Sequence, residues 1–226
     1  MKILHFTAHL GGGIGAAYIG IGRCGFNQTI ILLEEPKNVV NLQRVTEAGF
    51  RILVVPSRGE IEKEIRDTDV CVFSWWHHPK MAELMADFPK IPVRSVLWAH
   101  ISGNYFPHIH PGFLMLFDRV AFATPFTMGL PEVELLGIDW IGKRTEIVYG
   151  LGDVTRFANI IPVNHEKFVI TYIGTLSLSK LHLDFVDFCA AVDVPGVEFA
   201  MVGDTSSKDL ILREAGKKGI EGKFRF

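Results

Sequence analysis

Short apolar runs of strand length alternate with helix-patterned stretches along most of the chain. These runs are rich in Val, Ile, Leu or Phe with little polar alternation, as expected for strands buried on both faces of a parallel sheet. The predicted strands span Lys2–Phe6, Thr29–Leu33, Arg51–Val55, Val70–Ser74, Arg94–Trp98 and Arg119–Ala123. The predicted helices span Ala16–Arg23, Lys37–Ala48, Glu60–Asp67, Pro79–Phe88, Pro111–Leu116 and Pro125–Leu136. This alternation predicts βαβ units with right-handed crossovers.

The pattern breaks once and then restarts. After a predicted strand at Glu146–Val148, the stretch Thr155–His165 is irregular and contains Pro162. We therefore place a domain boundary there, with an N-terminal domain over residues 1–158 and a second domain over residues 159–226. In the second domain, strands are predicted at Phe168–Gly174, at Glu198–Val202 and from Lys223, and helices at Leu183–Val192 and Ser207–Lys217.

The second domain has few residues for a Rossmann-like alternation of strands and helices. Its open sheet has room for about three strands, and so small a unit buries a poor fraction of its surface. The last predicted strand is still running at Phe226. We expect an α/β fold of two Rossmann-like parallel-sheet domains, the second incomplete, so that the sequence is a fragment of a longer protein or the second domain leans on the first.

Composition narrows the classes of function. The chain has 226 residues, of which 48% are hydrophobic and 21% charged, which is ordinary for a globular protein. Its formal net charge is −2 without a basic run, and this argues against a nucleic-acid partner, because a phosphate backbone requires clustered Lys and Arg. No apolar run is long enough to cross a membrane, and no signal-peptide pattern is present. Three scattered cysteines, Cys24, Cys71 and Cys189, indicate reduced thiols and a cytoplasmic protein.

A glycine-rich stretch joins the first predicted strand to the first predicted helix. It contains Gly11, Gly12, Gly13 and Gly15. Glycines there permit a positive φ and a close approach by another group. The helix N-terminus beside them offers unpaired N–H groups to an anion such as a phosphate. The alternative is a tight strand-to-helix connection with no ligand.

Four stretches in this order resemble glycosyltransferase family 4, the group 1 glycosyltransferases, which have the GT-B fold. They are Gly11–Gly15, Trp98–His100, Glu146–Asp153, and Tyr172–Lys180 with the later Met201–Asp204. The sequence also departs from the family's pattern. Thr175 stands where the family usually has arginine, Leu181 where it has glycine, and Gly150 and Leu151 where it has asparagine and glycine.

The resemblance implies transfer of a sugar, with retention, from a nucleoside-diphosphate sugar to a glycan, a lipid or another acceptor. It implies no cofactor and no metal, and a setting in polysaccharide or glycoconjugate synthesis, cytoplasmic or peripheral at the inner face of the membrane. By resemblance His100 is the catalytic residue, which contacts the transferred sugar. The donor and its diphosphate would be bound by Gly12, Gly13, Gly174, Thr175 and Lys180. For each side chain the alternative is a structural or solvated residue.

Aromatic and histidine side chains cluster at two further places. Trp75, Trp76, His77 and His78 follow the fourth predicted strand and are candidates for an acceptor-binding wall; core packing of the tryptophans is the equal alternative. His108 and His110 form a His-x-His pair, a pattern that invites a metal interpretation. The pair lacks the companion Cys or carboxylate pattern of a zinc site, so we expect no metal there.

Two other functions fit parts of the sequence. An NAD(P)-dependent oxidoreductase is suggested by Gly11–Ala16, which matches G-x-G-x-x-A, with Glu34 about twenty residues further on. Against it, Thr7–Leu10 separate the first strand from the first glycine. A non-catalytic GT-B relic that binds carbohydrate or nucleotide is suggested by the departures at Thr175 and Leu181.

Overall fold

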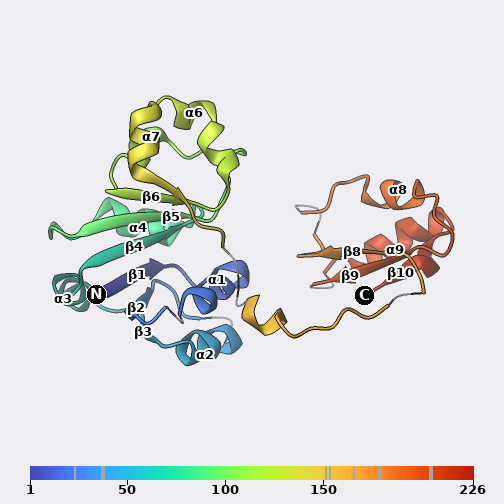
Figure 1. Cartoon of the computed structure of the whole chain (residues 1–226), viewed down its shortest axis with the longest axis horizontal. Coiled ribbons are helices and arrows are strands. Elements are labelled where there is room, and N and C mark those ends of the chain that lie inside the picture. Colours follow the sequence, from blue (N-terminus) through green and yellow to red (C-terminus); the bar gives the residue numbers. More distant parts are fainter. Residues whose placement is uncertain are drawn as a thin grey trace. The chain divides into compact units, whose positions relative to one another are not determined.

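The computed structural model describes residues 1–22, 24–36, 39–150, 152, 154–164, 166–177, 180–203 and 206–226. The chain divides into two compact units, Met1–Asn159 and Ile160–Phe226 (Figure 1). Each unit has its own parallel sheet and its own hydrophobic core.

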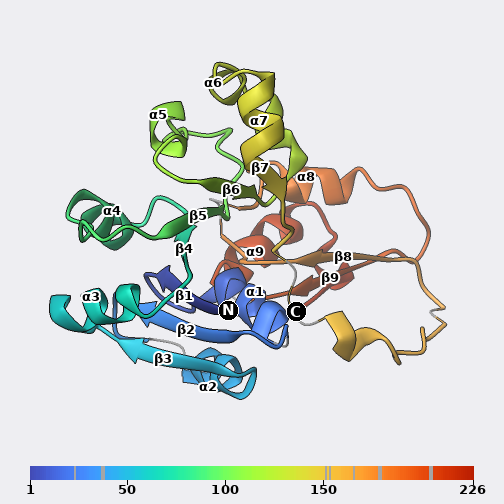
Figure 2. The same ribbon diagram turned by 60° about the vertical axis from the view of Figure 1, so that its left-hand side comes forward.

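The described residues of the first unit form a seven-stranded parallel sheet in the order β3-β2-β1-β4-β5-β6-β7, which can be followed in Figure 2. The strands are β1 Lys2–Thr7, β2 Asn27–Leu32, β3 Phe50–Val54, β4 Val70–Trp75, β5 Arg94–Ala99, β6 Arg119–Phe122 and β7 Thr145–Ile147. All seven predicted strands are confirmed to within two residues. The strand order reverses between β1 and β4, so the connections on either side of this point run in opposite directions.

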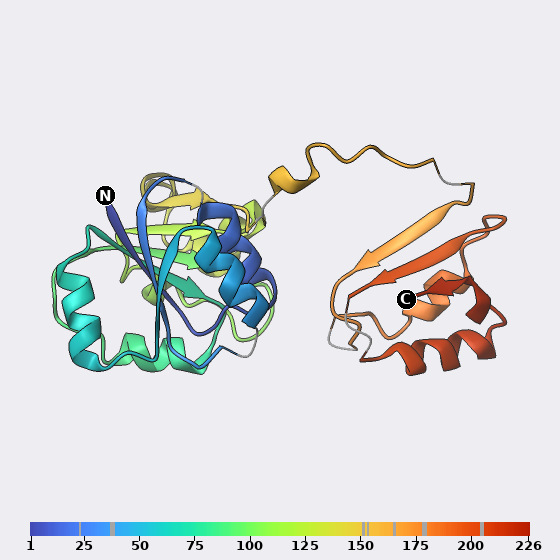
Figure 3. The same cartoon turned by 90° about the horizontal axis from the view of Figure 1, so that it is seen from below.

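Helices cover both faces of this sheet. Helices α1 (Gly12–Gly22) and α2 (Val39–Glu47) lie on one face, and α3 (Arg58–Arg66), α4 (Pro79–Ala86) and α5 (Pro111–Leu114) lie on the other (Figure 3). The alternation of β2 shows the division, because Ile30 and Leu32 pack in the cluster with α1 and α2 while Ile31 packs in the cluster with α3 and α4. Strands buried on both sides explain the nearly continuous apolar runs of the sequence.

Two helices of the first unit begin with a His–Pro pair. His78 and His110 are the N-cap residues of α4 and α5, and Pro79 and Pro111 occupy the first helical turn. In each pair the imidazole Nδ1 accepts a backbone N–H of its helix. Proline fits the first turn because its missing N–H has no partner there in any case.

Two predicted helices differ from those observed. Helix α1 begins at Gly12, four residues before the predicted Ala16, with Gly12 at a φ of +53°. The single helix predicted over Pro125–Leu136 divides into a 3₁₀ helix, η1 (Pro125–Gly129), and α6 (Pro131–Glu134). Pro131 excludes the helical conformation from Leu130, which is extended instead. A further helix, α7 (Ile138–Arg144), was not predicted.

The second unit is a partial Rossmann-like layer. Its described residues form strands β8 (Val169–Ile173), β9 (Glu198–Val202) and β10 (Phe224–Arg225), in the parallel order β10-β9-β8. Helices α8 (Phe185–Ala190) and α9 (Lys208–Lys217) pack on one face around Phe199 and Met201. The remaining 3₁₀ turns of the chain are η2 (Val154–Phe157) and η3 (Glu221–Lys223).

Two of the three cysteines are buried. Cys71 lies in β4 and Cys189 in α8, and both are buried free thiols, whereas Cys24 is exposed. Burial raises the pKa of the Cys71 thiol to about 12 and that of Cys189 to about 11. These two thiols are therefore protonated and unreactive at neutral pH.

Substitution of Gly15 by alanine should destabilise the first unit. A methyl group at Gly15 would overlap the carbonyl oxygen of Leu10 and lie 2.7 Å from Asn41 Nδ2, which donates a hydrogen bond to that oxygen. We expect Gly15→Ala to lower the free energy of unfolding by about 1–3 kcal/mol. Urea denaturation measures this change.

Gly13→Ala is the matched control for that substitution. A methyl group there would meet nothing within 4 Å among the described residues, and alanine favours a helix over glycine. Its free energy of unfolding should stay constant or rise slightly. Equal losses in both variants would contradict the steric argument.

Candidate functional site

The carboxyl ends of β1 and β4 adjoin at the point where the strand order reverses. In open α/β sheets this crevice is the place where ligands bind. Gly11, Gly12 and Gly13 follow β1, and the run Trp75–His78 lies at the end of β4. The topology therefore places the glycine-rich stretch beside the predicted acceptor wall.

Helix α1 presents an open N-terminus at this edge. A methyl group at Gly12 or Gly13 would meet no atom within 4 Å in the described part of the chain. The positive φ at position 12 favours glycine there. At position 13, neither the φ nor any described neighbour requires glycine. The backbone N–H groups of the first turn are thus accessible to a ligand, and the helix dipole favours an anion there.

A cavity of about 290 Å³ adjoins the glycine-rich stretch. Its lining includes His9 and Gly11 after β1, Glu34 after β2 and His78 after β4. One side-chain atom each of His9, Glu34 and His78 lies within 4.8 Å of the others, and His78 Nε2 lies 3.6 Å from Glu34 Oε1. Two imidazoles and a carboxylate at this spacing are a candidate ligand set for a metal ion.

The hydrogen bonds of the two histidines oppose metal binding. His9 Nδ1 accepts the N–H of Gly11 at 3.0 Å, and His78 Nδ1 accepts the N–H of Lys80 at 3.2 Å. A neutral imidazole has one acceptor nitrogen, so each ring carries its proton on Nε2. His78 Nε2 therefore faces Glu34 as a donor and has no lone pair for a metal. The group is better suited to bind polar ligand atoms by hydrogen bonds.

His100 lies directly after β5, at the same edge of the sheet. Its Nε2 is 3.1 Å from Ser74 Oγ, and the ring of Trp98 stands 4.3 Å from its own ring, centroid to centroid. Burial lowers the pKa of His100 to about 4, so the imidazole is neutral at physiological pH. A methyl group at Gly150 would lie 3.9 Å from His100 Nδ1 and 4.0 Å from Ala17 Cβ of α1. Gly150 thus lies close to both His100 and α1.

The predicted acceptor wall divides into core and surface residues. Trp75 is buried in the core, where its ring packs 4.4 Å from that of Phe113. Trp76 is partly exposed, and its ring lies 5.5 Å from that of His9 and 6.3 Å from that of His100. Trp76 therefore forms part of the row of rings that runs from the cavity to His100.

His77 has a different environment from His78. Its φ is +62°, an uncommon conformation for a residue with a Cβ. Its Nε2 is buried and has no hydrogen-bond partner among the described residues. Burial lowers the pKa of His77, opposed by a hydrogen bond to the Pro107 backbone. His77 thus connects the turn after β4 to the loop that contains Pro107.

His108 and His110 are both engaged in local structure. His108 Nδ1 lies 2.9 Å from the carbonyl oxygen of Gly103, and His110 caps α5. The structure does not bring their side chains into the group formed by His9, Glu34 and His78.

Three predicted donor-binding residues lie in the loop after β8. Gly174 ends the strand at a φ of +154°, and its N–H donates to the carbonyl oxygen of Val202 at 2.9 Å. Thr175 and Lys180 are exposed. The predicted positions of Leu151, Asp153 and Asp204 lie outside the described residues.

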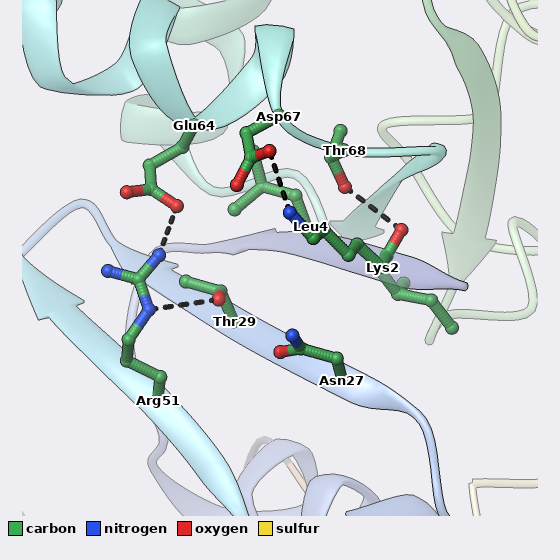
Figure 4. Close-up of a pocket in the computed structure, with 9 residues that line it drawn as sticks. Lys2, Leu4, Asn27, Thr29, Arg51, Glu64, Asp67 and Thr68 are labelled. Atoms are coloured by element: carbon green, nitrogen blue, oxygen red, sulfur yellow. Dashed lines mark hydrogen bonds and ion pairs between the residues drawn. The ribbon is translucent and has the colours of Figure 1, made fainter.

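A second cavity, of about 250 Å³, lies at the opposite edge of the first sheet (Figure 4). Four of its charged side chains pair with one another: Lys2 Nζ is 2.7 Å from Asp67 Oδ1, and Arg51 pairs with Glu64 and donates to Thr29. It lies at the amino ends of the strands, where open α/β sheets do not bind their ligands. We therefore assign the candidate site to the carboxyl edge.

Sequence reasoning missed four residues of this edge. His9 and Glu34 line the cavity, although Glu34 had been considered only as a cofactor ligand. Tyr18 and Ser74 are buried, and their oxygens are 2.8 Å apart. The signal available for Ser74 was a hydroxyl within the otherwise apolar strand Val70–Trp75, and for Tyr18 a large polar side chain in a helix of small residues.

Acid should destabilise the first unit through two buried histidines. Burial lowers the pKa of His5, opposed by its hydrogen bond to Gln28, and that of His100, each from 6.5 to about 4. At a pH between about 4 and 6.5, these two histidines are protonated in the unfolded chain but neutral in the folded chain. The free energy of unfolding should therefore fall as the pH drops from about 6.5 to 4. Each histidine should contribute up to about 1.4 kcal/mol per pH unit, and below pH 4 the contribution of both should stay constant.

The measurement is urea denaturation at a series of pH values. His5→Gln and His100→Gln should each flatten the curve of unfolding free energy against pH between pH 6.5 and 4. An unchanged slope in both variants would show that neither imidazole stays neutral in the folded state.

No helix in the described ranges is long and apolar enough to cross a membrane.

Comparisons with known proteins give a fold but no sequence family. No protein-family model and no curated protein sequence matches the chain. A glycosyltransferase from Rickettsia africae ESF-5 matches with a TM-score of 0.67 at 15% identity, over 99% of this chain and 67% of that one. Anabaena Alr3699/HepE in complex with UDP matches with a TM-score of 0.66 at 15% identity, over 100% of this chain and 68% of that one.

The lipopolysaccharide outer core galactosyltransferase WaaB, in its apo form, matches with a TM-score of 0.60 at 13% identity, over 100% of this chain and 67% of that one. At these identities the likeness establishes the fold. The chain has the α/β GT-B fold, with two Rossmann-like parallel-sheet units of which the second is partial.

Proposed function

We propose that the chain belongs to a glycosyltransferase that moves a sugar from a nucleoside-diphosphate sugar to a glycan, a lipid or another acceptor. The observation that carries the proposal is the open glycine N-terminus of α1 beside neutral His100 at the switch point of a GT-B fold. The first feature suits a phosphate and the second a sugar hydroxyl or another oxygen.

The resemblance to family 4 supplies the finer part of the proposal. Transfer proceeds with retention and without a metal, and the acceptor attacks the face that the diphosphate leaves. The protein's part is positioning and stabilisation of the charge that develops on the leaving group. The first turn of α1 at Gly12 and Gly13 takes this role in the first unit. In the second unit, exposed Lys180 supplies a cation for the diphosphate, with Gly174 and Thr175 earlier in the same loop after β8.

The acceptor is proposed to bind along the row of rings after β4. Partly exposed Trp76 offers an aromatic face, and His78 and Glu34 offer a donor and an acceptor in the cavity next to it. Buried Trp75 contributes by packing. This combination of an apolar face with hydrogen-bonding groups fits a carbohydrate.

The oxidoreductase alternative receives less support. Glu34 would have to bind a ribose, but its carboxylate faces His78 in the cavity. The first helix also starts five residues after β1 ends, which is farther than the dinucleotide motif requires. The alternative of a non-catalytic GT-B relic rests on the departures from the family pattern at Thr175 and Leu181. It predicts that carbohydrate or nucleotide binds without transfer of a sugar.

The proposal is tested by calorimetry and thermal denaturation with UDP-, GDP- and ADP-sugars, UDP and NAD(H). The titrations use this chain and any longer natural form of the protein. A ligand that binds the native state raises the midpoint by mass action. A response to a nucleotide sugar supports the proposal, and a response to NAD(H) alone overturns it. UDP-sugars come first, because HepE has been crystallised with UDP-glucose.

Gly13→Ala should separate ligand binding from stability. The added methyl group would fill open space at the first turn of α1 while touching nothing described in the chain. We expect affinity for the responding nucleotide sugar to fall by about tenfold or more, at an unchanged unfolding midpoint. The matched control is Gly142→Ala in α7, another open helical position away from the site. Equal affinity in both variants would contradict a phosphate at α1.

His100→Ala should slow sugar transfer more than it weakens donor binding. Removal of one preorganised hydrogen-bond donor costs about 10²–10³ in rate. Steady-state kinetics of the responding nucleotide sugar measure this, with Trp76→Leu as a companion expected to raise the KM of the acceptor. An unchanged rate in His100→Ala would remove His100 from the mechanism.

A further inference from the structure

Three groups form a hydrogen-bonded row that ends at His100. The Tyr18 hydroxyl oxygen lies 2.8 Å from Ser74 Oγ, and Ser74 Oγ lies 3.1 Å from His100 Nε2. Tyr18 and Ser74 are fully buried, whereas His100 is partly exposed. Within the described part of the chain, neither hydroxyl has a further hydrogen-bond partner. The protons of the row must therefore be satisfied within the row.

The direction of donation follows from the donors and acceptors available. A hydroxyl has one proton to donate, and a neutral imidazole has one donor and one acceptor nitrogen. If Tyr18 donates to Ser74 and Ser74 donates to His100, both hydroxyl protons find an acceptor. If His100 donates from Nε2 instead, either Tyr18 or Ser74 keeps a buried O–H group without an acceptor. A buried donor without a partner loses the hydrogen bond that water gave it, so the first order is favoured.

The charge state of the ring agrees with this order. An imidazolium would carry protons on both nitrogens and could not accept from Ser74. Burial keeps the pKa of His100 near 4, so the ring is neutral at pH 7. Nδ1 points toward exposed Gly150, where a methyl group would lie 3.9 Å from it. The nitrogen that bears the proton is therefore the one next to exposed backbone.

We propose that Ser74, oriented by Tyr18, positions His100 with its proton on Nδ1, so that His100 presents a hydrogen-bond donor and not a base. Ser74 and Tyr18 are positioning residues, because both are buried and act through His100. The ligand group that such a donor takes is an oxygen acceptor, either a sugar hydroxyl or a diphosphate oxygen. This consequence for the ligand rests on the proposed function, whereas the tautomer does not.

The tautomer is measured directly on the 226-residue chain labelled with ¹⁵N-histidine. Long-range ¹H–¹⁵N correlation spectra distinguish a protonated from an unprotonated ring nitrogen, and His100→Gln identifies the signals of His100. In the wild-type protein at pH 7 we expect Nδ1 protonated and Nε2 unprotonated. A protonated Nε2 with an unprotonated Nδ1 would overturn the proposal without any variant.

Three variants test which hydroxyl sets the tautomer. Ser74→Ala removes the donor to Nε2 and should give a mixture of tautomers or the Nε2–H form. Tyr18→Phe removes the donor to Ser74 and leaves Ser74 Oγ open to accept from His100 Nε2, so it should raise the share of the Nε2–H form, though less than Ser74→Ala does; an unchanged spectrum would exclude Tyr18 as a positioning residue. Thr127→Val is the matched control, because it removes a buried hydroxyl that donates to the Ser102 carbonyl oxygen at 2.9 Å, outside the row. Unchanged His100 signals in folded Ser74→Ala would exclude Ser74 as the positioning residue.

Ligand titration of the same sample separates the two oxygen acceptors. A change of the Nδ1 signal with UDP alone indicates a diphosphate oxygen, and a change only with a UDP-sugar indicates a sugar hydroxyl. If no nucleotide or nucleotide sugar changes the signal, the consequence for the ligand is wrong, while the tautomer measured without ligand stands or falls separately.

Discussion

The close packing of α1 on the sheet is the constraint on which the rest of the candidate site depends. Gly15 allows the helix to approach the carbonyl oxygen of Leu10, which also accepts a hydrogen bond from Asn41. At this distance the Tyr18 side chain reaches from α1 to Ser74 on β4, and both residues are fully buried. The same packing fixes the helix N-terminus beside the end of β4. A helix held further away would move its N-terminal N–H groups from the end of β4 and would break the hydrogen bond between Tyr18 and Ser74.

The imidazoles of this edge act as neutral hydrogen-bonding groups beside one carboxylate, that of Glu34. Backbone N–H groups hold the Nδ1 atoms of His9 and His78 as acceptors, which leaves their Nε2 atoms as donors. At His100, burial keeps the ring neutral and Ser74 faces Nε2, so that Nδ1 is the proposed donor. The carboxylate of Glu34 lies in the cavity among these imidazoles. Apart from the Glu34 carboxylate and the positive end of α1, such an edge distinguishes ligands by the direction of their donors and acceptors.

Most of the architecture could be predicted because parallel strands buried on both faces have a local signature. Runs such as Val70–Trp75 are apolar throughout, and the prolines at 79 and 111 mark helix starts. The start of α1 was mispredicted because its first residues are glycines, whose low helix propensity is overridden by packing on the sheet. The division at Pro131 had a local cause, the restriction on Leu130, that the apolar periodicity concealed. Trp75 and Trp76 are neighbours in sequence, yet Trp75, the last residue of β4, packs in the core, whereas Trp76, just after the strand, is partly exposed.

The sequence by itself determined the α/β class, the alternation of strands and helices, and the positions of the glycine-rich stretch and His100 at strand ends, because these depend on residues close together in the chain. Only the tertiary structure decided which of these residues meet. His9, Glu34 and His78 follow three different strands, and Tyr18, Ser74 and His100 come from a helix, a strand and the residue after another strand. The proton positions on these rings depend on such partners, since an imidazole or hydroxyl takes its role from the group it faces.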